Sequence, residues 1–84
     1  MSARDNVRMN LIWLIDNRTG GSKAEFARSI GVYPQKVNNW VHGNNAPELE
    51  TVGMIAMVYD LSLDWLIGGD ASKAPSDYKE ADNG

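Results

Sequence analysis

The residues best suited to chemistry lie between positions 31 and 45, and that chemistry is hydrogen bonding rather than catalysis. Amide and hydroxyl groups predominate there beside one lysine: Tyr33, Gln35, Lys36, Asn38, Asn39, Asn44 and Asn45. The stretch contains no Asp or Glu. An amide can form two hydrogen bonds with adenine in the major groove of DNA, and a lysine can reach guanine or a phosphate. The simpler interpretation is a solvated helix surface, on which such side chains are ordinary.

Two short helices and a tight turn must position these side chains. The S-x-x-E sequence that starts at Ser22 predicts a capping box at the beginning of the first helix. Gly31 suits the point where this helix ends, because a glycine tolerates the left-handed conformation common there. Pro34 suits the first turn of the next helix, where its missing N–H is not needed. The sequence therefore predicts helices over 22–29 and 34–42.

The apolar residues of both helices recur three and four positions apart, which predicts one buried stripe on each. They are Ala24, Phe26, Ala27 and Ile30 in the first helix, and Val37, Trp40 and Val41 in the second. The amides of the second helix fall on the opposite side and are expected to face outward.

This arrangement resembles the helix-turn-helix of the Cro and lambda-repressor type. Ala27 matches the small residue inside the family's first motif helix, and Gly31 matches its turn glycine. The interlocking apolar positions are matched by Phe26, Ile30, Val32, Val37 and Trp40. Segments 47–51 and 60–66 resemble the family's connections into its fourth and fifth helices, so the likeness covers about residues 5–68.

The resemblance implies an all-α fold: a compact five-helix, lambda-repressor-like DNA-binding domain with the helix-turn-helix at helices 2 and 3. We expect this domain to span residues 1–69. Besides the two motif helices, the apolar patterns predict helices over 5–17, 48–59 and 62–67. Residues 70–84 are polar and lack an apolar period, which favours a disordered acidic tail.

The resemblance also implies roles for individual residues. Bases would be read from Tyr33, Gln35, Asn38 and Asn39, to which the chemistry of Lys36 adds a fifth candidate. Contacts to the DNA backbone would come from Arg18, Ser22, Lys23, Asn44 and Asn45. Trp65 and Ile67 would contribute to a dimer contact.

Two departures from the family pattern lower the expected affinity. Asn44 and Asn45 stand in a loop where relatives often carry basic residues, and Pro34 stands where they often carry a hydrogen-bonding side chain.

The net charge of −3 is unevenly distributed along the chain. Residues 1–45 carry six basic and three acidic side chains, whereas residues 46–84 carry two basic and eight acidic ones. The motif half can therefore present a positive face to phosphate, but with few charges, so we expect modest affinity and a weak dependence on salt.

Composition argues against several other classes of protein. Without cysteine there is no disulfide or thiolate metal site, and with one histidine, His42, a metal site would need carboxylates almost alone. No nucleophile–base pair, cofactor motif or small-molecule site is evident, and Gly20–Lys23 lacks the preceding strand and the spacing of a phosphate loop. No apolar run is long enough for a membrane span or a secretory signal. We expect no enzyme, cofactor, metal or membrane partner.

The leading hypothesis is a sequence-specific DNA-binding transcriptional regulator. It would be a Cro-like or phage-type repressor that binds a palindromic operator as a homodimer. We expect it in the cytoplasm of a bacterium, encoded by the bacterium or by a phage. The alternative is a protein-interaction module, antitoxin-like, anti-repressor or adaptor, that keeps the fold.

Overall fold

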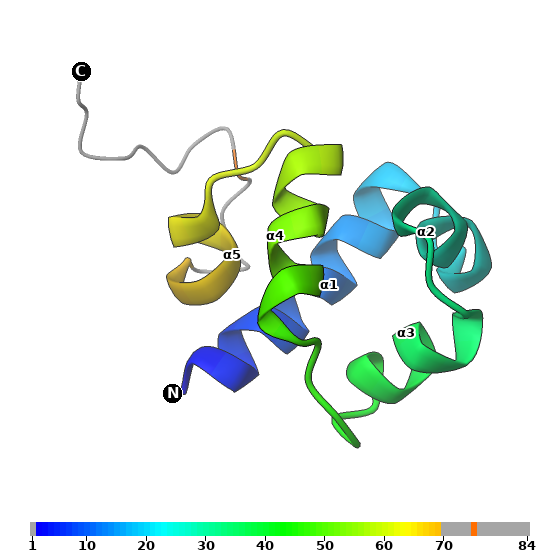
Figure 1. The fold of residues 1–84 in the computed structure, drawn as a ribbon, viewed down its shortest axis with the longest axis horizontal. Helices are drawn as coiled ribbons and strands as arrows, with labels where there is room; N and C mark the ends of the chain where they lie inside the picture. The colour runs from blue at the N-terminus through cyan, green and yellow to red at the C-terminus, as the bar shows by residue number, and fades with distance from the viewer. Residues whose placement is uncertain (1, 70–74, 76–84) are drawn as a thin grey trace.

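The computed structural model describes residues 2–69 and 75, and this part of the chain contains five helices and no strand. The helices are α1 (Ala3–Arg18), α2 (Lys23–Ile30), α3 (Pro34–Val41), α4 (Leu49–Val58) and α5 (Leu63–Gly68). Figure 1 shows α2 and α3 at one end of α1 and α5 at the other, with α4 between them. The all-α, five-helix prediction is confirmed.

The first helix begins earlier than its apolar pattern indicates. Ser2 accepts a hydrogen bond from the backbone N–H of Asp5 over 3.2 Å and so caps α1, which starts at Ala3. The other predicted helix ends differ from the observed ones by at most one residue. The predicted tail, 70–84, falls outside the described residues except for Pro75.

One hydrophobic core joins all five helices. Its fully buried large side chains include Phe26 from α2, Val37 from α3 and Trp65 from α5. Trp13 of α1 packs edge-on against Trp65, with the ring centroids 5.6 Å apart. This burial corrects the expectation for Trp65, which has no exposed surface to offer a second copy of the chain, whereas Ile67 is half-buried.

A buried asparagine ties α1 to the end of α5. The Nδ2 of Asn10 donates to the carbonyl oxygens of Trp65, Leu66 and Gly69 at 2.8, 3.2 and 3.2 Å. Carbonyls at a helix C-terminus lack partners within the helix, and this one amide group bonds three of them, including the Trp65 carbonyl that also accepts from the N–H of Gly69 over 2.8 Å. The backbone is tight here, since a Cβ on Gly69 would lie 2.5 Å from the carbonyl oxygen of Trp65.

Replacing Asn10 with alanine should therefore destabilise the fold by about 2–3 kcal/mol, since it removes three buried hydrogen bonds that join α1 to the end of α5 and opens a small cavity. Urea unfolding followed by circular dichroism measures this. Asn17→Ala is the matched control, because Asn17 is exposed and its side chain, among the described residues, bonds only the Trp13 carbonyl of its own helix. Equal midpoints for the two variants would contradict the role assigned to Asn10.

Candidate nucleic-acid interface

The turn between α2 and α3 has the geometry expected at Gly31. This residue has φ 76°, in the left-handed region that favours glycine. Its N–H donates to the carbonyl of Arg28, and the N–H of Val32 donates to that of Ala27, at 3.3 and 3.0 Å. This pair of hydrogen bonds is a Schellman motif, which ends α2 and directs the chain into α3.

The start of α2 forms only half of the predicted capping box. Ser22 Oγ accepts from the N–H of Glu25 over 3.0 Å, as expected. The N–H of Ser22, however, donates to the carbonyl of Thr19 over 3.0 Å, so the Glu25 side chain is not needed there. Glu25 is exposed in the first turn, where a carboxylate still interacts favourably with the helix dipole.

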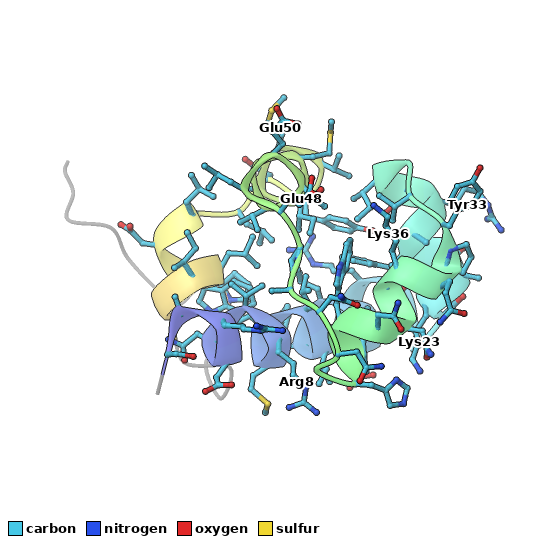
Figure 2. All side chains as sticks on the ribbon, turned by 60° about the horizontal axis from the view of Figure 1, so that its bottom comes forward. Arg8, Lys23, Tyr33, Lys36, Glu48 and Glu50 are labelled. Carbon is cyan, nitrogen blue, oxygen red and sulfur yellow. The ribbon has the colours of Figure 1, made fainter. Side chains whose placement is uncertain are left out.

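Helix α3 presents the polar face that its spacing predicts. Val37 and Trp40 are buried against the core, while Gln35 on the other side is exposed. Tyr33, just before the helix, is 79% exposed and points away from the body of the protein (Figure 2). The polar side of α3 is therefore accessible to a large partner.

Three amides on this face are joined to one another. The Nε2 of Gln35 donates to Oδ1 of Asn39 over 3.3 Å, and the Nδ2 of Asn44 approaches the same oxygen at 3.5 Å. Asn44, which is expected to contact the DNA backbone, thus lies next to Gln35 and Asn39, which are expected to read bases. Asn45 is exposed beside it.

A second contact crosses the turn. The Nζ of Lys23, at the start of α2, donates to Oδ1 of Asn38 over 3.2 Å. Ser22, Lys23 and Asn38 are half-buried, so the first turn of α2 lies beside the polar face of α3. Arg18 is exposed at the end of α1, and its side chain forms no hydrogen bond with these residues.

Lys36 lies where α3 approaches the start of α4, beside Asn39 and Asn45. It lines a pocket of about 220 Å³ together with Glu48 and Thr51 at the start of α4. Figure 2 shows Lys36 and Glu48 on this flank and Glu50 further along α4. The carboxylate of Glu48 thus shares a pocket with the one cationic side chain of α3, which weakens the positive potential there.

Two residues hold the C-terminal end of α3. The Nδ1 of His42 is 2.8 Å from the carbonyl oxygen of Asn38, so this histidine is engaged at the helix end rather than in a catalytic site. Arg8, reaching from α1, donates from Nε to the carbonyl of Val41 over 2.8 Å. Gly43 follows with φ 80° and lies against the Arg8 side chain.

Sequence reasoning missed Arg8, because no local pattern reveals a contact that joins residues 33 positions apart. It could have found Asn10, which stands three residues after Val7 and four before Leu14, on the apolar stripe of α1. The described residues contain no group of three or more His, Cys, Asp or Glu side chains that could hold a metal ion. None of their helices is both long and apolar enough to cross a membrane.

The comparison with protein families identifies this arrangement. A family model described as helix-turn-helix, of the Cro/C1 type, matches residues 17–66. No curated protein and no solved structure gives a significant match. The chain belongs to this helix-turn-helix family, whose members are DNA-binding regulatory domains rather than enzymes, and residues 17–66 include all of α2, α3 and α4.

Arg8→Leu should loosen the C-terminal end of α3, because it removes a charged donor from the Val41 carbonyl. We expect a loss of about 1–2 kcal/mol of stability and faster hydrogen exchange at the amides of Gly43 and Asn44. Arg4→Leu is the control, since Arg4 lies one turn earlier on α1, is exposed and forms no hydrogen bond with the described residues. Exchange that is as slow in Arg8→Leu as in Arg4→Leu would argue against this contact.

Proposed function

We propose that the protein is a sequence-specific transcriptional repressor that inserts α3 into the major groove of a palindromic operator. The observation that carries this proposal is the outward face of α3, on which Gln35, Asn38 and Asn39 gather without a carboxylate. A helix of eight residues is about 12 Å long, comparable to the width of the groove. A cytoplasmic role in a bacterium or its phage fits this proposal.

Within this proposal, each side chain has a task. Gln35 and the asparagines Asn38 and Asn39 read base edges, with Tyr33 positioned to touch a thymine methyl or a phosphate and Lys36 to reach guanine or a phosphate from its flank. The backbone of the DNA is contacted by Arg18, Ser22, Lys23, Asn44 and Asn45. Because few of these are charged, counterion release adds little to the affinity, and hydrogen bonds to base edges supply the selectivity.

We further propose that the repressor acts as a homodimer. Its surface beside α4 and α5 carries exposed apolar side chains: Leu49 and Met57 are 82% and 79% exposed, and Leu63 is 48% exposed. Ile67 lines one pocket with Leu49, while Met57 and Leu63 line another. Such exposed apolar side chains are typical of an interface, and a two-fold dimer would place two α3 helices on half-sites about 34 Å apart.

Selection from a pool of random duplex DNA at low salt tests the function directly. The expected result is an enriched, two-fold symmetric sequence. In that sequence, Gln35→Ala should lose about 1–3 kcal/mol of discrimination at one base pair in each half-site. Asn6→Ala, an amide on α1 outside the interface, should leave the preference unchanged.

Equal losses on the enriched and a scrambled duplex for Gln35→Ala would remove its role as a base reader. If no DNA were retained even at about 50 mM salt, the protein-interaction alternative would take precedence. That alternative draws its support from the same exposed apolar side chains on α4, and it predicts that replacing Gln35 and Lys36 has no effect on partner binding.

Met57→Asp should abolish dimer formation, because a carboxylate at this exposed apolar position would have to be buried in the proposed interface. Sedimentation equilibrium measures the oligomeric state, and the same variant should occupy the two half-sites without cooperativity. Met9→Asp, which changes an exposed methionine of α1, is the control. A monomeric wild-type protein at concentrations that saturate the operator would rule out the dimer.

A further inference from the structure

One hydrogen bond joins a residue expected to contact phosphate to a residue expected to read a base. It is the bond of 3.2 Å from Nζ of Lys23 to Oδ1 of Asn38, between half-buried side chains of α2 and α3. The two residues are 15 positions apart in the chain and meet only because the turn at Gly31 brings the helices together.

The chemistry of this bond fixes the direction of the Asn38 amide. An ammonium group carries three donors and no acceptor, so only the oxygen of the amide can face it. With Oδ1 turned toward α2, Nδ2 is directed elsewhere, and it has no hydrogen-bond acceptor among residues 2–69. The bond between Gln35 and Asn39 sets no such direction, because two amides can exchange donor and acceptor roles by turning over.

We propose that Lys23 is a positioning residue that determines which base Asn38 selects. This inference rests on the proposed function. Held by Lys23, Asn38 presents donors to the groove and turns its oxygen away. Guanine offers two acceptors, N7 and O6, whereas adenine pairs with an amide by offering one donor and one acceptor. The amide of Asn38 therefore favours guanine over the adenine that a freely turning asparagine would select.

The remaining donors of Lys23 stay available for a phosphate. One ammonium can bond the DNA backbone and Asn38 at the same time, so loss of Lys23 has two separable effects. Loss of the phosphate contact lowers affinity for every sequence by the same factor, whereas release of Asn38 changes the preference at one base pair.

The first experiment compares the sequences selected from random duplex DNA by the wild-type protein, Lys23→Met and Lys23→Arg. The base pair read by Asn38 is the one at which Asn38→Ala loses its preference. At this pair we expect the wild-type protein to prefer guanine, roughly five- to a hundredfold, as a good side-chain contact to a base edge gives. In Lys23→Met, the preference for guanine should fall to half of that factor or less, and adenine should be selected more often. Lys23→Arg should keep the preference for guanine, because arginine also offers only donors.

Arg18→Met is the matched control. It removes a cation expected at the DNA backbone that has no contact with a base reader, so it should weaken all sequences alike. Thermal melts of each variant establish that the fold is kept, which separates a change of preference from a loss of structure.

Asn38→Asp gives a second, independent test that does not require removal of Lys23. Its carboxylate keeps the contact with Lys23 but has no donor, so the preference at the same pair should change from guanine to cytosine, whose N4 is a donor. This prediction distinguishes an oriented donor from a general polar contact.

Three results would overturn the inference. If Lys23→Met weakens every sequence as Arg18→Met does, with guanine still preferred, Lys23 is a phosphate contact and nothing more. Wild-type preference for adenine at the Asn38 pair would show that the amide is not held as proposed. Failure of the wild-type protein to enrich any sequence would remove the proposed function itself, and this inference with it.

Discussion

Two side chains of α1 satisfy the C-terminal carbonyls of two other helices, and the arrangement of the domain depends on them. Asn10 donates to the end of α5, and Arg8 donates to the end of α3. Residues two positions apart on a helix project about 200° apart around its axis, so one helix can hold partners on nearly opposite sides. This matters because α2 to α5 have at most ten residues each, and helices so short are not stable alone in water.

The position of α3 follows from this frame and from its own burial. Val37 and Trp40 anchor one side of the helix in the core, and Arg8 fixes its end, so the polar side can face only outward. The face is organised by amide groups, while the acidic side chains Glu48 and Glu50 begin the next helix. A surface of this composition attracts DNA weakly at long range, which makes short-range hydrogen bonds decisive for the binding we propose.

Much of the fold could be predicted from local patterns. The helices follow from apolar spacing, the cap at Ser22 from its residue type, and the turn from Gly31, because each depends on neighbours within a few positions. The turn at Asp60 could not be predicted in this way. Asp60 follows α4 with φ 54°, a conformation that glycine adopts most often, so its residue type gives only a weak signal of a helix end.

Contacts between distant residues could not be predicted in the same way. Trp13 and Trp65 both look like core or interface residues in the sequence, and only the packing of α5 on α1 decides that Trp65 is fully buried. For the candidate site, the family pattern indicates which residues face outward, but the bond from Lys23 to Asn38 depends on the distance between two helices. The residue types of the site were thus predictable, while the direction of its amides was not.

That direction bears on how a sparsely charged face could bind selectively. An amide that is free to turn loses this freedom on binding and can adapt to more than one base, which lowers both affinity and selectivity. An amide already held by Lys23 has lost it on folding, and a wrong base then leaves a buried donor unpaired. Asn44 and Asn45 stand in place of basic residues, so electrostatic attraction to DNA is weak. An amide whose direction is already fixed in the free protein compensates for this weakness. In the binding we propose, selectivity therefore comes from the packing of α2 on α3 as much as from the residues that touch the bases.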